Sequence, residues 1–324
     1  MFDEKSNIMK LKDIFTNYSS EKKSKLAFKQ WRDKQGVCCK KCKGTSHYWK
    51  ADKWQYECKN CRFRTTLKSG TVMESSKLPF QYWMIAIALI SATKKSFSAM
   101  EMQRQLDHKY YEPIWYMLHK IRASMGKRDD KYKLDGQLEI DEGFFEGQRE
   151  KAEELPDEES KYSAYGNDGK RQVKVLVIVE SERVKVPHRN TNRPKRKVGF
   201  LKMKVIEKIT RQNVEHEIKS HTKPTATAIT DGRSCYSNLE NVLADHTAYT
   251  LNDPALAHKL MPWVHIAISN AKKICLGVHH SIKRTFMQSY LNEFCYKFNR
   301  RYLGDKLFEH LMMASVEAPW YGIR

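Results

Sequence analysis

The chain has 324 residues, of which 40% are hydrophobic and 30% are charged, and its 59 lysines and arginines exceed its 38 acidic residues by 21. This length corresponds to about two domains, and the composition is typical of a folded chain. The longest apolar run, at residues 83–90, is far shorter than the ~20 residues that cross a bilayer. The first ten residues lack the apolar segment of a secretory signal. These features exclude an integral membrane protein and predict a cytoplasmic one.

The positive charge is concentrated in the N-terminal part of the chain. Residues 1–130 carry 27 basic and 13 acidic residues, whereas residues 131–324 carry 32 and 25. An excess of this size, with a pI near 9.5, favours a polyanionic partner. The N-terminal part is therefore the better candidate for docking on nucleic acid, and a solvated basic surface is the alternative interpretation.

A cluster of cysteines follows a predicted helical segment at residues 1–35. The pairs Cys39-x2-Cys42 and Cys58-x2-Cys61 are separated by fifteen residues, which is the spacing of a four-thiolate zinc site. A chain without a secretion signal is expected in a reducing compartment, which disfavours disulfides. We therefore predict a structural zinc ribbon within residues 36–70. The scattered Cys235, Cys275 and Cys295 are predicted as buried thiols, and Cys38 as a spare.

The segment between the two cysteine pairs, SHYWKADKWQYE, alternates in the way of a β-hairpin. Gly44 after the first pair suits a tight turn there, since glycine tolerates a positive φ. Arg62, Arg64 and Lys68 are candidates for phosphate contacts. Taken alone, this surface does not distinguish DNA from RNA or from a protein partner.

Residues 71–132 are predicted to be a helical DNA-binding region. The apolar stretch 80–92 indicates a buried helix, with Pro79 in its first turn. A shorter helix follows, capped by Ser96 or Ser98, with an inward face formed by Met100, Met102 and Leu106.

A third helix in this region has one apolar stripe, formed by Ile114, Met117, Leu118 and Ile121. Two helices joined by a turn fit a helix-turn-helix, although many helical pairs produce the same pattern. The second helix of this pair carries His119, Lys120 and Arg122. We predict DNA contacts for Lys120 and Arg122, and for Arg104 on the first helix.

The C-terminal part predicts an α/β domain with a mixed sheet. Strands are expected at 136–145, 173–180, 199–206 and 226–230, and helices at 208–220, 264–276 and 282–298. The polar segment 148–171 is predicted as a loop, and the basic segment 188–197 as a turn between the second and third strands.

Two aspartates stand on strands of this predicted sheet. Asp141 lies on the first strand and Asp231 at the end of the fourth, so on neighbouring strands they would share a divalent ion. An aspartate at a strand end is more often a turn residue. Glu142 should point to the opposite face, so we leave it out, whereas Glu139 shares the face of Asp141 and is a reserve ligand.

Four further segments occur in a characteristic order around these residues: GTVMESSKLPFQYW, LEIDEGFFEG, AITDGRSCYSNL and the run from residue 263 to 301 that ends in NEFCYKFNRR. Together with the cysteine pairs they resemble the zinc-ribbon insertion-sequence transposases of the ISXO type, over roughly residues 36–305. The resemblance implies a ribonuclease-H-like catalytic domain, predicted at 133–324. It also implies DDE-type cleavage and joining of DNA with Mg²⁺ or Mn²⁺, by a homo-oligomer assembled on the element ends.

Asp141 and Asp231 match the first two acids of the DDE motif, but the third acid departs from it. The expected glutamate falls about 34 residues after Asp231, where this chain has His265. Asn270 is the other neutral candidate, and His265 is favoured by its spacing. Lys272 stands at the family's lysine position, and Lys273 is a second candidate for holding phosphates.

Three functions are consistent with these features. The first is an active transposase. The second is a domesticated or inactive transposase that only binds DNA, which the missing third carboxylate motivates. The third is an RNA-associated zinc-ribbon factor. The paired aspartates at strand ends argue against it, because a module that only binds RNA does not need them. Inverted repeats flanking the gene would separate the first from the second.

Overall fold

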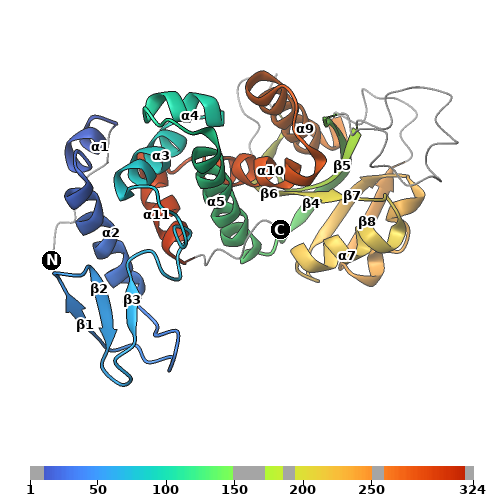
Figure 1. Cartoon of the computed structure of the whole chain (residues 1–324). Coiled ribbons are helices and arrows are strands. Elements are labelled where there is room, and N and C mark those ends of the chain that lie inside the picture. Colours follow the sequence, from blue (N-terminus) through green and yellow to red (C-terminus); the bar gives the residue numbers. More distant parts are fainter. Residues whose placement is uncertain (1–10, 149–171, 185–193, 250–258, 318–324) are drawn as a thin grey trace, which may run out of the picture. The chain divides into compact units, whose positions relative to one another are not determined.

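The computed structural model of the chain describes residues 11–148, 172–184, 194–249 and 259–317 (Figure 1). The chain forms two compact units. The first, which we call the ribbon unit, comprises Met1–Asp129 and Arg300–Arg324, and the second, the sheet unit, comprises Asp130–Asn299. We expected the catalytic domain to extend to residue 324, but the residues from Arg300 onward group with the ribbon unit. Most of the predicted loop at 148–171 and turn at 188–197 lies outside the described residues.

The ribbon unit begins with two helices and a small antiparallel sheet. The helices are α1 (Leu11–Asn17) and α2 (Glu21–Gln35), and the sheet consists of β1 (His47–Lys50), β2 (Gln55–Cys58) and β3 (Arg64–Thr66) in that order. Ser20 caps α2 by accepting a hydrogen bond from the main chain of Lys23. The predicted hairpin between the cysteine pairs is confirmed by the pairing of β1 with β2.

Four more helices belong to the ribbon unit: α3 (Phe80–Ala92), α4 (Ala99–Gln105), α5 (Tyr111–Asp130) and α11 (Leu307–Glu317). The apolar stripe of α5 is buried as predicted, and Ser98 caps α4. Pro79 precedes α3 as its cap instead of lying in the first turn. Leu311 and Met312 on α11 are fully buried, and the carbonyl of Ser315 accepts from the main chain of Val72. This burial explains why the C-terminal helix belongs to the ribbon unit.

The predicted inward face of α4 is partly wrong. Met102 and Leu106 are buried, but Met100 is 71% exposed. Two residues correspond to about 200° around an α-helix, so Met100 and Met102 cannot share a face.

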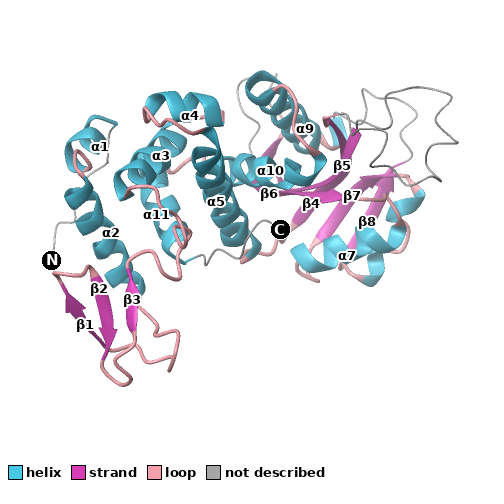
Figure 2. Ribbon diagram, in the orientation of Figure 1, coloured by secondary structure: helices cyan, strands magenta, loops and turns pink. Residues whose placement is uncertain are grey.

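The sheet unit contains one five-stranded mixed sheet (Figure 2). Its strands are β4 (Gln137–Glu146), β5 (Gln172–Arg183), β6 (Arg196–Ile206), β7 (Thr227–Asp231) and β8 (Asp245–Tyr249). Their spatial order is β6-β5-β4-β7-β8, with β4, β5 and β6 antiparallel and β7 parallel to both β4 and β8. This is the ribonuclease-H-like mixed sheet that the sequence predicts. The sequence analysis missed β8, whose polar residues at the sheet edge carry no apolar alternation.

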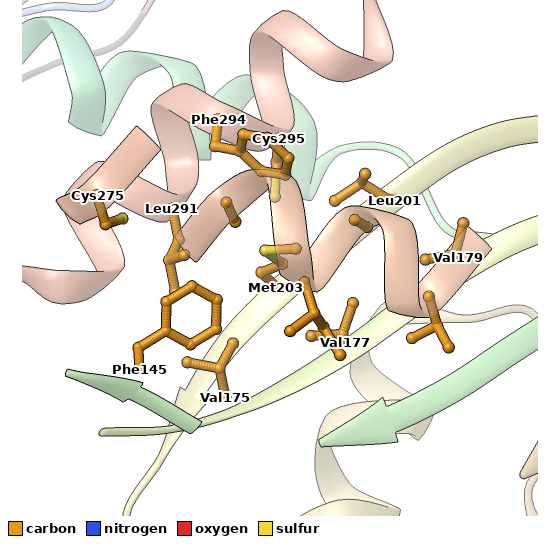
Figure 3. Close-up of a cluster of buried hydrophobic side chains, with 14 of the residues drawn as sticks. Phe145, Val175, Val177, Val179, Leu201, Met203, Cys275, Leu291, Phe294 and Cys295 are labelled. Carbon is orange, nitrogen blue, oxygen red and sulfur yellow. The ribbon is translucent and has the colours of Figure 1, made fainter. Parts of the chain in front are cut away.

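The two faces of the sheet are covered by different elements. One face packs against α7 (Arg211–His221) and the short 3-10 helices η3 (Ser234–Tyr236) and η4 (Leu239–Asn241). The other packs against α9 (Pro262–Ile274), a π turn (Cys275–His279) and α10 (Arg284–Asn299). On that second face, the side chains of β5 and β6 meet those of α10, as Figure 3 shows for Val177, Met203, Leu291 and Phe294.

The three scattered cysteines of the sheet unit are buried, as predicted. Among the described residues, no helix combines the length and apolar character needed to cross a membrane.

Candidate active site and zinc site

The four cysteines of the ribbon form a compact cluster. The sulfur atoms of Cys39, Cys42, Cys58 and Cys61 all lie within 4.8 Å of one another. Cys39 Sγ is 3.6 Å from Cys61 Sγ, and Cys42 Sγ is 3.5 Å from Cys58 Sγ. Each CxxC pair thus meets the other across the hairpin. Four thiolates at one point are the donor set of a structural zinc site, so the residues fit this ion.

The two CxxC turns have the same backbone geometry. The main chain of Lys43 donates to the carbonyl of Cys39 at 2.9 Å, and Arg62 donates to Cys58 at 3.0 Å. Lys43 and Arg62 both have a φ of 60°, so in the first turn the positive φ falls on Lys43 and not on Gly44, which the sequence suggested for it. A Cβ at Gly44 would lie 2.9 Å from Asn60 Nδ2 and 3.4 Å from the sulfurs of Cys42 and Cys58, so a larger residue there would require the Asn60 side chain to shift.

Main-chain N–H groups around the cluster favour the thiolate form. A hydrogen bond from the backbone of Cys42 lowers the pKa of Cys39 to about 7, and the backbone of Cys61 lowers the pKa of Cys58. Because zinc binds the thiolate, these turns prepare Cys39 and Cys58 for the metal. Side-chain hydrogen bonds with Cys61 and Cys58 instead raise the pKa of Cys42 to about 12.

The predicted phosphate-contacting residues of the ribbon unit differ in exposure. The side chains of Arg62, Arg64 and Arg104 are 68%, 53% and 76% exposed. Arg62 and Arg64 both approach the carboxylate of Glu57, at 3.4 and 3.3 Å. The half-buried ammonium of Lys68 instead donates to main-chain carbonyls of residues 76 and 78.

Lys120 and Arg122 are buried, contrary to the prediction that they contact DNA. Lys120 Nζ donates to the carbonyl of Glu74 at 2.6 Å, and Arg122 Nη2 donates to Ser96 Oγ and to the carbonyl of Phe97. Both side chains fasten loops to α5, because a buried charge requires such partners. We therefore leave them out of the DNA-binding surface.

In the sheet unit, Asp141 and Asp231 lie on adjacent parallel strands. Glu139 on β4 is paired with Ile229 on β7, so two residues further along each strand Asp141 and Asp231 stand at the same level. Their carboxylate oxygens and an oxygen of Glu142 all lie within 4.8 Å of one another. Two acids that are 90 residues apart in the chain thus converge with a third at one edge of the sheet.

The prediction that Glu142 points away from these acids is wrong. Its Cβ does project toward the α7 face, where its carboxylate accepts from Cys235 Sγ at 3.1 Å. However, β7 ends at Asp231, so beyond that point the β7 side of β4 has no neighbouring strand to separate the two faces, although β5 continues on the other side. The longer glutamate side chain therefore reaches the edge that carries the aspartates.

Arg233 holds two of these three carboxylates. Its Nη1 lies 3.1 Å from Glu142 Oε2, and its Nε lies 3.1 Å from Asp231 Oδ2. The arginine side chain is 53% exposed, whereas that of Glu142 is fully buried. The cluster is therefore closed on the protein side and open where the guanidinium meets solvent.

The electrostatics of the cluster oppose full ionisation. Burial, together with the charges of Glu142 and Asp231, raises the pKa of Asp141 to about 7. Burial and the charge of Glu142 also raise the pKa of Asp231. Carboxylates in this situation are short of positive charge, which a divalent cation would supply.

Helix α9 brings His265 to this cluster and leaves Asn270 outside it. His265 Nδ1 lies 3.5 Å from Asp141 Oδ2. Asn270 is exposed, because five residues correspond to about 140° around the helix. Lys272 Nζ lies 5.9 Å from the ring centre of Phe145, further along β4, and Lys273 is exposed.

Glu139 is engaged elsewhere and is not placed as a ligand. Its carboxylate is fully buried and accepts from the main chain of Trp263 and Val264 at 2.7 and 2.9 Å. It also accepts from Ser181 and pairs with Arg196 Nε at 3.3 Å. Glu139 therefore ties the N-terminus of α9 to β4. On β4 this anchor lies two residues before Asp141, and on α9 it lies one residue before His265.

Comparison with known families decides the identity of the sheet unit. Residues 133–299, more than half of the chain, match the ISXO2-like transposase domain. The chain belongs to the ISXO2-like transposase family. Comparison with curated proteins gave no match. Family membership makes DNA the partner of this transposase and favours the first two of the three functions that the sequence allows over an RNA-associated factor. Asp141, Asp231 and His265 all lie inside the matched residues.

The transposase also contains site residues that sequence analysis missed. Glu142 and Arg233 are two of them, and Tyr236 is a third. The Tyr236 hydroxyl is buried with no hydrogen-bond partner among the described residues. Burial and the charge of Glu142 raise its pKa well above the usual value. The signal that was available is the DGR turn, where a charged residue follows a buried strand within two positions of Asp231.

The donor set at this edge fits Mg²⁺ or Mn²⁺. Carboxylate oxygens are the ligands that these hard cations prefer, and the cluster offers oxygens from three residues within a span of 4.8 Å. The cluster is not a self-neutralising ion pair, because it contains three carboxylates and only one guanidinium.

Proposed function

We propose that the transposase cleaves and joins DNA strands at the ends of an insertion sequence, with Asp141 and Asp231 holding Mg²⁺ or Mn²⁺. The observation that carries this proposal is the convergence of the two aspartates at one edge of the matched domain. When bound, such ions activate a hydroxyl nucleophile and stabilise the leaving oxygen.

The residues around the aspartates would contribute positioning and charge. We propose His265 in place of the third carboxylate of the DDE motif, supported by its 3.5 Å approach to Asp141. A neutral imidazole ligates metal ions without adding charge. Asn270, the other candidate, has no such support from its exposed position. Lys272 and Lys273 on the same helix would hold phosphates as point charges.

Binding to the element ends is proposed for the ribbon and the helices that follow it, in residues 36–132. The exposed guanidinium groups of Arg62, Arg64 and Arg104 support this assignment, and zinc would keep the ribbon folded. We also propose that copies of the chain assemble on paired ends. A single copy carries one cluster of active-site acids in its described residues, whereas an element has two ends to process.

Cleavage of a DNA duplex that carries the inverted repeats flanking the gene tests this function. Wild-type protein with Mg²⁺ or Mn²⁺ should nick the duplex at the repeat boundary. Asp141→Asn and Asp231→Asn should bind the duplex with unchanged affinity and lose cleavage by at least a thousandfold. The matched control is Asp245→Asn, an exposed aspartate at the start of β8, which should cleave at the wild-type rate.

A binding-only transposase is the second candidate, favoured by the histidine at the position of the third acid. Specific binding of the repeats by wild-type protein, without cleavage in either metal, would support it. Full-rate cleavage by Asp231→Asn would instead remove the cluster from the mechanism.

A further inference from the structure

The position expected for the third carboxylate of the DDE motif holds His265. The residues of that motif therefore give this site one negative charge fewer than three carboxylates would. We propose that Glu142, the neighbour of Asp141 on β4, supplies this carboxylate and ligates the metal ion with Asp141 and Asp231. The inference rests on the proposed function, because it concerns the same site.

The placement of Glu142 is the first support. Its carboxylate lies within 4.8 Å of the oxygens of both aspartates, although its side chain starts on the opposite face of the strand. The Glu142 side chain is fully buried. Burying a carboxylate costs several kcal/mol unless positive or hydrogen-bonding partners compensate it. Arg233 and Cys235 are such partners for Glu142, and a metal ion bound by the cluster would add another.

The charge balance of the cluster is the second support. Asp141, Glu142 and Asp231 together carry three negative charges when ionised, and Arg233 neutralises one of them. The remaining two match a divalent cation. Arg233 bridges Glu142 and Asp231 from the solvent side, so the protein already places a positive group against these two carboxylates.

This assignment changes the role of His265. With three carboxylates present, the imidazole is not needed to replace a charge. Its contact with Asp141 then orients that carboxylate or adds a neutral donor. Removal of His265 should therefore weaken metal binding less than removal of the Glu142 charge does.

Metal affinity of the full-length, zinc-loaded protein without DNA tests the assignment. Mn²⁺ binding, followed by electron paramagnetic resonance of the free ion, gives a readout that does not depend on cleavage. Both Glu142→Gln and Asp141→Asn should weaken Mn²⁺ binding at least tenfold. Glu142→Asp, which keeps the charge, should retain more affinity than Glu142→Gln, and His265→Ala should lose less.

Two control variants separate ligation from other effects. Glu146→Gln changes an exposed glutamate at the end of the same strand and should bind Mn²⁺ as the wild type does. Arg233→Gln removes the ion-pair partner but keeps Glu142, and it should bind Mn²⁺ at least as tightly as the wild type. Circular dichroism confirms that each variant is folded.

The contradicting results are distinct. Wild-type affinity in Glu142→Gln, with weakened binding in Asp141→Asn, overturns the role of Glu142 and leaves the proposed function intact. Equal weakening in Arg233→Gln and Glu142→Gln also overturns it, because the effect then runs through the ion pair. Wild-type affinity in Asp141→Asn and Asp231→Asn as well would overturn the proposed metal site itself.

Discussion

Asp141 carries the largest electrostatic cost of the acidic cluster. Its side chain is 15% exposed, and burial is the main reason that its pKa rises to about 7. An aspartate in the unfolded chain has a pKa near 3.8. Between these two values the folded protein keeps a proton that the unfolded chain releases. Without divalent metal, stability therefore falls as the pH rises from about 4 to about 7.

Asp141→Asn should remove this loss. At pH 7.5, without Mg²⁺ or Mn²⁺, we expect the variant to exceed the wild type in free energy of unfolding by on the order of 4 kcal/mol. The advantage should nearly vanish near pH 3, where the wild-type carboxyl is mostly protonated in both states. Urea unfolding at the two pH values measures it, with Asp245→Asn as the control. An equal difference at both values would show that the cost is not one of ionisation.

At the scale of elements, Glu139 determines where α9 begins relative to β4. Replacing it with glutamine keeps the size of the side chain but removes the charge that faces Arg196 and the helix N-terminus. We expect Glu139→Gln to lower the free energy of unfolding by about 3 kcal/mol, since breaking a buried ion pair leaves one charge uncompensated. Glu182→Gln, at an exposed position on the neighbouring strand β5, should change stability by less than about 0.5 kcal/mol. Equal effects in denaturant unfolding would contradict this role.

The ribbon offers a matched pair of neighbouring cysteines. Cys39 belongs to the thiol cluster, whereas Cys38 is exposed and outside it. Cys39→Ser should lose the bound zinc during dialysis, because three thiolates close the site poorly. Cys38→Ser should retain one zinc per chain, as the wild type does. Metal analysis of the purified proteins decides this, and zinc retained by Cys39→Ser would show that the cluster is not the site.

The sequence predicted the elements that carry a regular apolar pattern. The zinc hairpin, the stripe of α5 and the strand that carries Asp141 follow directly from spacing and alternation. The position of Glu142 was predicted wrongly because the alternation of side chains along β4 does not reveal where the neighbouring strand β7 ends. Lys120 and Arg122 were misplaced because α5 is buried on nearly all sides between residues 117 and 126. A charged side chain that bonds to main-chain carbonyls leaves no pattern in the sequence. His265 was predicted from the resemblance, which implies a third ligand about 34 residues after Asp231, and the structure places its imidazole 3.5 Å from Asp141.

At the scale of the whole molecule, the net charge of +21 predicts DNA binding that depends on salt. Arg62 and Arg64 are the exposed guanidinium groups of the ribbon. If both contact phosphates, the double variant Arg62→Ala/Arg64→Ala should reduce the slope of log affinity against log salt by about 2. Fluorescence anisotropy over a salt series measures the slope. Lys306→Ala, at an exposed site in the same unit, is the comparison, and an unchanged slope in the arginine variant would exclude these contacts.

The position of a bound Mn²⁺ ion would show directly whether Asp141 and Asp231 form the active site. Anomalous diffraction from crystals of the transposase soaked in Mn²⁺ would locate the ion without reference to any activity. We predict a peak bonded to carboxylate oxygens of both Asp141 and Asp231, with Glu142 as the third acid. A Mn²⁺ ion that binds elsewhere in the sheet unit, or a site without contact to either aspartate, would contradict the proposed active site.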